Sequence, residues 1–210
     1  MPGLFITLEG GEGCGKTTQR AALAAALRQQ GHTVLETREP GGSPAAEALR
    51  RTLISDPTCT GLDPLATGLV IAAGRRDHLT TVICPALTEG TIVLCDRYID
   101  STWAYQHFAE GLPAATVQTL IDLASSQAPV PHLTLLYDLP VAIARQRWQE
   151  RAGGHDRYEG YADDYHERVR QGFLTRAVSE PQRIHVLNAD QPAERLTEGG
   201  VQKILCFLDR

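Results

Sequence analysis

The sequence predicts an α/β fold in which a five-stranded parallel sheet lies between helices. Segments of strand-like and helix-like composition alternate from one end of the chain to the other, which is typical of repeated β–α units. The strand-like segments are continuously apolar rather than alternating, as expected where helices cover both faces of a sheet. No repeat, low-complexity stretch or linker divides the 210 residues, so we expect one domain over residues 1–210.

The individual elements follow from local composition. Gly31 ends an Ala- and Leu-rich helix, Ser43 is a suitable N-cap, and Pro85 should bend or interrupt a long helix. The strands are expected at residues 4–8, 33–37, 91–95, 133–137 and 184–187. The helices are expected at residues 16–30, 43–54, 63–87, 112–125, 140–151, 161–179 and 192–208.

Composition excludes several classes of protein. The net charge is -5 and the pI is about 5.8, which argues against a general nucleic-acid binder. No apolar run approaches the roughly 18 residues of a membrane span, and the start of the chain lacks the features of a signal peptide. The five cysteines show neither CxxC nor zinc-ligand spacing, which suits a reducing compartment. We therefore expect a cytoplasmic protein without a membrane or nucleic-acid partner.

A glycine-rich loop follows the first strand and opens the first helix. It matches the phosphate-binding pattern G-x-x-x-x-G-K-[ST] in the strand–loop–helix context which that pattern requires. Its backbone N–H groups and the helix N-terminus suit phosphate oxygens, Lys16 suits the β- and γ-phosphates, and the Thr17 hydroxyl suits Mg²⁺. The loop consists of Gly10, Gly11, Glu12, Gly13, Cys14, Gly15, Lys16 and Thr17. This predicts binding of a nucleoside triphosphate and leaves the acceptor open.

Arginines and one carboxylate follow other strands, at the sheet edge where ligands bind in open parallel sheets. Asp96 and Arg97 come directly after residues 91–95, and Arg38 comes after the second strand. Arg75 lies beside Ala72, Ala73 and Gly74, small residues that permit a close approach by a ligand. The alternatives are a surface ion pair for Asp96 and Arg97, and a solvated helix face for Arg75.

These stretches resemble the thymidylate kinase family. The resemblance rests on residues 9–18 (EGGEGCGKTT), 37–42 (TREPGG) and 96–106 (DRYIDSTWAYQ), with a weaker stretch at 156–159 (DRYE). Their order and spacing cover almost the whole chain. The resemblance implies a three-layer P-loop kinase fold with a short mobile lid at about residues 145–159. It also implies a homodimer packed through long helices, for which the apolar stretch 65–79 is suitable.

The activity implied by the resemblance is transfer of the γ-phosphate of ATP to dTMP with Mg²⁺, a step in dTTP synthesis. Arg97 and Arg38 would hold the acceptor phosphate with Arg50 nearby, and two or three guanidiniums would neutralise that dianion. The other implied contacts are Arg75, Thr102 and Gln106 to the base, Tyr105 to the sugar, Glu12 to the 3′-hydroxyl, Asp96 to the metal, and Thr18 to ATP. For Glu12 the alternative is a side chain that points to solvent.

Members of the family without a basic residue in the phosphate loop supply a late-arriving arginine from the lid, and residues 12–14 of this chain contain no basic side chain. The resemblance therefore implies that the region around Ala152, Gly153 and Gly154 supplies that arginine. We expect Arg151 to fill this catalytic role and to contact ATP, with Arg157 as the second choice. Arg145 and Arg147 are equally well explained as an exposed helix face.

One position departs from the family pattern. Members usually place a Phe four residues before the base-reading arginine, whereas this chain has Ile71. An aliphatic side chain covers the ring without aromatic stacking geometry, so base affinity and selectivity are in question. Phe108 is an alternative source of an aromatic wall.

Two other functions compete with this interpretation. The first is a P-loop kinase that acts on a different nucleoside or nucleotide. The second is a GTPase switch, but the guanine-reading N-K-x-D motif is absent, since Asn188 is the only Asn and is followed by Ala189 and Asp190. The acidic net charge argues against a nucleic-acid motor. Residues 188–191 lie at the correct end of the sheet to contact adenine, and an ordinary capping loop explains them equally well.

Overall fold

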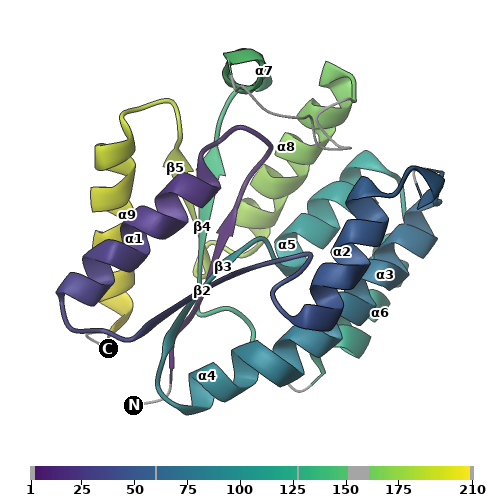
Figure 1. Ribbon diagram of the computed structural model, residues 1–210. Coiled ribbons are helices and arrows are strands. Elements are labelled where there is room, and N and C mark those ends of the chain that lie inside the picture. Colours follow the sequence, from purple (N-terminus) through teal and green to yellow (C-terminus); the bar gives the residue numbers. More distant parts are fainter. Residues whose placement is uncertain (1–2, 60, 127, 151–160, 209–210) are drawn as a thin grey trace.

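The computed structural model describes residues 3–59, 61–126, 128–150 and 161–208, and these build one parallel sheet between two layers of helices (Figure 1). The strand order is β2-β3-β1-β4-β5, and every neighbouring pair is parallel. The strands are β1 (Phe5–Glu9), β2 (Val34–Arg38), β3 (Ile92–Asp96), β4 (Leu133–Asp138) and β5 (Ile184–Asn188). The predicted α/β class and all five predicted strands are confirmed, each within two residues of its expected ends.

The register brings the ends of three strands together. Leu8 of β1 and Arg38 of β2 both pair with Asp96 of β3. The loop after β1, the turn after β2 and the residue after β3 therefore meet at one edge of the sheet, which in Figure 1 lies between the β1–α1 loop and α2. This is the carboxyl edge, where open parallel sheets bind ligands.

One helical layer consists of α1 (Lys16–Gln29) and α9 (Ala193–Leu208), which lie side by side in Figure 1. Leu23 and Leu27 of α1 and Ile204 of α9 are fully buried against strand residues such as Ile6 and Leu94. A buried Leu or Ile contributes about 1.5–3 kcal/mol relative to an exposed one, so this contact fixes the helix that opens at the loop.

The other layer covers the opposite face, where Phe5, Val93 and Cys95 pack on Val117 and Ile121. Residues 93 and 95 face this layer while 92 and 94 face α1 and α9, which is why the strands are apolar throughout. The larger helices of this layer are α2 (Pro44–Ser55), α3 (Pro64–His78), α6 (Ala114–Ser125) and α8 (Asp163–Ser179). The shorter helix α7 (Val141–Glu150) follows β4 at the carboxyl edge.

The predicted helix over residues 63–87 is interrupted, but earlier than expected. Helix α3 ends at His78, a π-helical turn η2 spans Leu79–Ile83, and α4 (Cys84–Thr88) completes the segment. Pro85 lacks an N–H and crowds the carbonyl four residues before it, so the wider π turn ahead of it relieves the conflict. The N-cap prediction is confirmed, because Ser43 Oγ accepts from the N–H of Ala46 at 3.2 Å.

The segment after β3 was not predicted as helical. It forms α5 (Ile99–Thr102) and then a π-helix η3 (Trp103–Ala109), while the helix expected from residue 112 begins at Ala114, after Pro113. A short 3₁₀ turn, η1 (Pro57–Cys59), follows α2. Helix α8 packs along η3, which also contacts α3 and α6, so the segment that follows Arg97 is held among these helices.

Candidate active site

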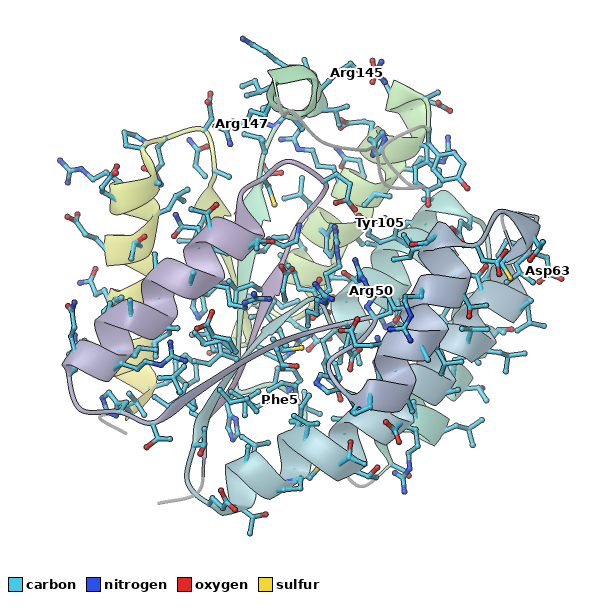
Figure 2. The ribbon with its side chains drawn as sticks, in the orientation of Figure 1. Phe5, Arg50, Asp63, Tyr105, Arg145 and Arg147 are labelled. Atoms are coloured by element: carbon cyan, nitrogen blue, oxygen red, sulfur yellow. The ribbon has the colours of Figure 1, made fainter. Side chains whose placement is uncertain are left out.

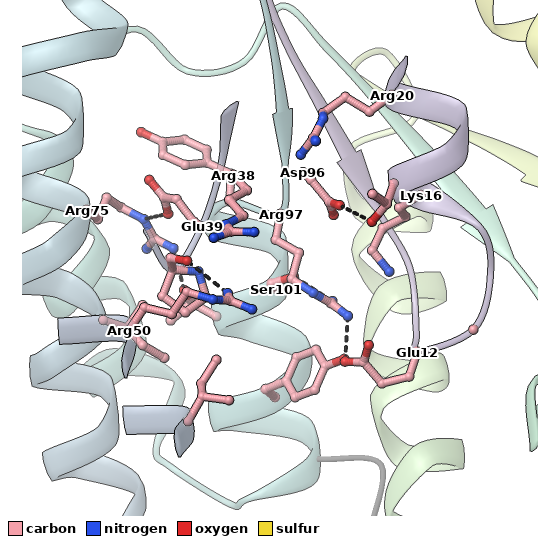
Figure 3. Close-up of a pocket in the computed structure, with 18 of the residues that line it drawn as sticks. Glu12, Lys16, Arg20, Arg38, Glu39, Arg50, Arg75, Asp96, Arg97 and Ser101 are labelled. Atoms are coloured by element: carbon pink, nitrogen blue, oxygen red, sulfur yellow. Dashed lines mark hydrogen bonds and ion pairs between the residues drawn. The ribbon is translucent and has the colours of Figure 1, made fainter. Parts of the chain in front are cut away.

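A cavity of about 460 Å³ lies at the carboxyl edge of the sheet, between the loop after β1 and helices α2 and α3. Figure 2 shows Arg50 and Tyr105 in the space between that loop and α2, and Figure 3 shows Arg38, Arg50 and Arg97 pointing into it from different elements. All nine predicted acceptor residues line this cavity: Glu12, Arg38, Arg50, Ile71, Arg75, Arg97, Thr102, Tyr105 and Gln106. Gly13, Gly15, Lys16, Thr17, Thr18 and Asp96 line it too.

Three predicted loop residues do not line the main cavity. Gly10 and Gly11 border a smaller adjoining cavity, and Cys14 is 1% exposed. Cys14 Sγ lies 3.1 Å from the Gly11 carbonyl and 3.4 Å from Lys16 Nζ, so its side chain packs inside the loop. Arg151 and Arg157 lie outside the described residues.

The loop has the backbone geometry of an anion site. Gly15, at the N-cap of α1, has φ 89° and makes no side-chain cap, so the first N–H groups of the helix face the loop. Gly10 has φ 142°, and a Cβ there would lie 2.5 Å from the Tyr137 carbonyl, so only glycine fits. Lys16 Nζ donates to the carbonyls of Gly10 at 3.0 Å and Gly11 at 2.8 Å, which holds the ammonium at the loop.

Arg97, Glu12 and Tyr105 form one contact group in the cavity. Arg97 Nη2 donates to Glu12 Oε1 at 2.6 Å, and the Tyr105 hydroxyl donates to the same oxygen at 2.8 Å. Arg97 also donates to the Gly10 carbonyl, and its guanidinium lies 5.1 Å from the centre of the Tyr105 ring. The backbone of Arg97 is left-handed, with φ 70°, which is uncommon for a non-glycine residue and turns the side chain toward the loop.

Glu12 is thus directed into the cavity, and its side chain is only 18% exposed. Burial acts to raise the pKa of Glu12, but the charges of Arg97 and Lys16 and the hydrogen bond from Tyr105 outweigh it and lower that pKa to about 2. A carboxylate that stays ionised is an acceptor only, and its free lone pairs can receive a hydroxyl group. The alternative in which Glu12 points to solvent is wrong.

Arg75 is buried rather than on a solvated helix face. It is 3% exposed, and its Nε donates to Glu39 Oε2 at 2.7 Å while Nη2 donates to Thr102 Oγ1 at 3.0 Å. Tyr98 lies against its guanidinium, with the ring centre 5.0 Å away. Arg75 therefore enters the cavity from α3 with its orientation fixed by three neighbours.

Arg38 and Arg50 stand on the side of the cavity formed by β2 and α2. Arg38 Nη2 donates to both oxygens of Glu47, at 3.1 and 3.0 Å, and its side chain is 48% exposed. Arg50 Nη1 donates to the carbonyl of Pro40, which follows a cis peptide bond. The structure places both guanidiniums beside the cavity, where they can meet an anion.

Thr17 and Asp96 form a pair of oxygen donors. The Thr17 hydroxyl donates to Asp96 Oδ2 at 3.2 Å, and Asp96 is 9% exposed at the end of β3. Among the described residues no three His, Cys, Asp or Glu side chains gather as a metal cluster. One hydroxyl and one carboxylate fit Mg²⁺, which is usually held by few protein ligands together with water and substrate phosphates.

Some residues at the site were given no role from sequence. Glu9 is 1% exposed and accepts from the backbone N–H of Tyr98 at 2.8 Å and the Ser101 hydroxyl at 2.6 Å. Burial and the charge of Asp100 raise the pKa of Glu9 to about 7, although the bond from Ser101 opposes this. A carboxylate directly after an apolar strand was the available signal for this residue.

Glu9 itself does not line the cavity. The lining residues without a predicted role are Arg20, Glu39, Pro40, Ile54, Tyr98, Ser101 and Arg147. Arg147 of α7 lines the cavity and donates from Nη2 to the Ala189 carbonyl at 3.2 Å. The loop after β5 therefore approaches the cavity, as its position at this edge of the sheet indicated. Arg145 instead forms an ion pair with Asp163.

The parallel sheet, the glycine loop that opens α1 and the arginine-lined cavity beside it define a kinase of the P-loop class. The model of the thymidylate kinase family matches residues 8–199. The chain belongs to the thymidylate kinase family.

Similar proteins extend over nearly the same length. The thymidylate kinase of Trichlorobacter lovleyi is 47% identical over 197 residues, which are 91% of this chain and 92% of that protein. The thymidylate kinase of Syntrophotalea carbinolica is 49% identical over 191 residues, 89% of this chain and 88% of that protein. The crystal structure of thymidylate kinase from Ehrlichia chaffeensis aligns with a TM-score of 0.78 and 32% identity, over 98% of this chain and 99% of that one. Within the described residues, no helix has the length and apolar character needed to cross a bilayer.

Proposed function

We propose that this chain transfers the γ-phosphate of ATP to dTMP, giving ADP and dTDP, as a step in dTTP synthesis. The observation that carries the proposal is the single cavity in which Arg38, Arg75 and Arg97 meet beside the phosphate loop. Membership of the thymidylate kinase family supports the same reaction and the same phosphate donor. It also disfavours a signalling GTPase or a nucleic-acid motor.

On the acceptor side, Arg97 and Arg38, with Arg50 nearby, neutralise the monophosphate dianion and direct one of its oxygens at the γ-phosphorus. Arg75 and Thr102 contact the base, with Gln106, and Ile71 covers its face. Glu12 accepts from the 3′-hydroxyl, and Tyr105, which donates to Glu12 at 2.8 Å, presses on the deoxyribose. The shared contact between Tyr105 and Glu12 supports one sugar subsite built by both.

On the donor side, the backbone N–H groups of residues 10–18 and the ammonium of Lys16 hold the phosphates of ATP. Mg²⁺ is held by Thr17 and Asp96, whose oxygens lie 3.2 Å apart. When bound, the ion offsets charge on the phosphates. Arg151, or failing that Arg157, supplies a late positive charge from a lid at about residues 145–159, within a single domain over residues 1–210.

The test is a coupled assay for ADP release with ATP, Mg²⁺ and each nucleoside monophosphate in turn. We expect dTMP to give the highest kcat/KM and omission of Mg²⁺ to abolish turnover. A preference for dCMP, UMP or a nucleoside would contradict the proposed acceptor. Hydrolysis of GTP without any acceptor would contradict the reaction class.

We also propose a cytoplasmic homodimer. Leu65 and Leu69 lie one turn apart on α3 and are 43% and 53% exposed, which gives that helix an apolar outer face. The five cysteines are all unpaired, which suits a reducing compartment. Light scattering in dilute solution should give twice the chain mass, and Leu69→Lys should give the monomer. A monomeric parent protein would contradict the proposal.

A further inference from the structure

Arg75 is held by a chain of buried side chains that extends away from the cavity. Its Nε meets Glu39 Oε2 at 2.7 Å, and Glu39 Oε1 lies 3.3 Å from Nδ1 of His78 (the Glu39 contact is drawn in Figure 3). Nε2 of His78 lies 2.6 Å from the hydroxyl of Thr37. Glu39, Arg75 and His78 are 4%, 3% and 0% exposed, so solvent does not satisfy their polar atoms.

The backbone fixes the two inner members of this chain, Glu39 and His78. Glu39 donates its N–H to the carbonyl of Asp96 at 2.9 Å, which ties the turn after β2 to the end of β3. Gly42 has φ 92°, and a Cβ there would lie 2.2 Å from Nε2 of His78. The loop over residues 40–43 therefore packs directly on the imidazole, and only glycine permits that approach.

The hydrogen bonds of the chain converge on the Glu39 carboxylate, which accepts from both sides. The ionised Glu39 carboxylate only accepts, so Nδ1 of His78 must carry a proton toward it. In the neutral ring Nε2 then accepts from the Thr37 hydroxyl. On the other side, both Nε and Nη2 of Arg75 donate, to Glu39 and to Thr102 Oγ1. The Thr102 hydroxyl accepts from Arg75, which leaves its own proton free to donate elsewhere.

The consequence at the cavity is a surface that offers hydrogen-bond donors at the base subsite. Arg75 has no acceptor atom, and Thr102 is turned into a donor by its bond to Arg75. Such a surface favours a pyrimidine whose facing edge carries a carbonyl over one whose edge carries an amino group. An amino group there would leave buried donors facing each other, which is costly.

From this geometry we infer that Thr37, His78 and Glu39 are positioning residues, which hold the Arg75 guanidinium in the orientation that reads the acceptor base. This rests on the proposed function. Glu39 supplies the charge that Arg75 faces and sets the imidazole tautomer, His78 holds the second oxygen of Glu39, and Thr37 donates to the other ring nitrogen of His78. None of the three needs to touch the reacting atoms.

The test compares two polar replacements of His78. In His78→Asn the amide nitrogen can take the place of Nδ1 and still donate to Glu39, whereas in His78→Gln the amide takes the place of Nε2 and leaves Glu39 Oε1 unmatched. We expect KM for dTMP to rise about tenfold in His78→Gln and less than about threefold in His78→Asn. The kcat and the KM for ATP should stay within about twofold in both. His32→Asn, at the opposite end of the sheet, is the matched control.

Selectivity gives a readout that a purely structural role would not move. The ratio of kcat/KM for dTMP over dCMP should fall about tenfold in His78→Gln and stay near the parent value in His78→Asn. Thr37→Val removes the hydroxyl at constant shape and should also lower this ratio. It is the second variant to use if the His78 variants fold poorly. Nitrogen-15 NMR of the parent protein should show a proton on Nδ1 of His78 and none on Nε2.

The outcomes separate this inference from the proposed function. A parent protein that does not phosphorylate dTMP overturns the function, while the NMR tautomer still tests the chain of contacts. If the parent protein is active, the inference is overturned when His78→Asn, His78→Gln and Thr37→Val all keep the parent's kcat and KM for dTMP. A proton on Nε2 of His78 overturns it as well. Equal losses of kcat with dTMP and dCMP would show that these residues support the fold without orienting Arg75, and would overturn the inference.

Discussion

Replacing Glu12 by Gln should reduce stability by an amount that can be worked out from its surroundings. The pKa of Glu12 is lowered from an ordinary value of 4.5 to about 2, because Arg97, Lys16 and Tyr105 outweigh the effect of burial. At about 1.4 kcal/mol per pKa unit, the ionised form gains on the order of 3 kcal/mol from the fold. Gln keeps the shape and part of the hydrogen bonding, so we expect a loss of about 2 kcal/mol at pH 7.

The difference between the two proteins should depend on pH. A carboxyl with a lowered folded-state pKa contributes stability above its unfolded pKa of 4.5 and loses it as the pH falls through the folded value of about 2. At about pH 3.5 the unfolded Glu12 is largely protonated while the folded one is not, so on the order of 1 kcal/mol of the advantage is gone. Gln has no such dependence, and the gap between the proteins should narrow accordingly.

Urea unfolding at pH 7 and at about pH 3.5 measures both values. Glu89→Gln, at an exposed site, is the matched control and should change stability by no more than about 0.5 kcal/mol. For a chain of this size the pH 7 effect corresponds to about 4–8 °C in Tm. Equal stability of the parent and Glu12→Gln, or a gap that stays the same at both pH values, would refute the reasoning.

Three further predictions concern the cavity. Ile71→Phe should lower the KM for dTMP by about threefold through ring stacking, measured by steady-state kinetics, and an unchanged or raised KM would show that Ile71 does not face the base. Asp96→Asn should raise the Mg²⁺ concentration for half-maximal activity by about tenfold, and an unaltered Mg²⁺ titration would remove Asp96 from the metal site. Arg97→Lys should lower kcat/KM for dTMP by about a hundredfold, because an ammonium cannot make the paired contacts of a guanidinium, and near-normal kinetics would contradict its role at the acceptor phosphate.

The position of the main site residues could be predicted from the sequence, because a parallel sheet carries its ligand residues at the ends of its strands. Arg38 and Asp96 each close an apolar strand, and Arg97 follows Asp96, so their meeting at one edge follows from strand direction alone. The loop at residues 10–17 was equally clear, since its glycines and Lys16 stand between a strand and a helix. The lining role of Ile71 and Thr102 came from the resemblance alone, whereas Arg75 also had a local signal in the small residues that precede it.

The supporting residues were harder to predict because their roles depend on tertiary packing. Glu39 reads as a loop carboxylate, and only the contact of α2 and α3 with the end of β2 buries it beside Arg75 and His78. The π-helix Trp103–Ala109 has no distinctive composition, since its i→i+5 pairing is set by the packing of α8 along it. Arg147 was compatible with an exposed face, and its contact with Ala189 depends on how α7 leaves the sheet.

Glu9, the buried carboxylate beneath α5, couples folding to proton uptake. Its folded-state pKa of about 7 exceeds its ordinary value of 4.5, so between these values the folded chain holds a proton that the unfolded chain releases. Its contribution to stability is therefore complete below about pH 4.5 and is lost as the pH rises through 7, the opposite direction to Glu12. Calorimetric unfolding at about pH 6 should accordingly show an enthalpy that varies with the ionisation heat of the buffer in the parent protein, because Glu9 gives up its proton on unfolding, and this part of the dependence should be lost in Glu9→Gln.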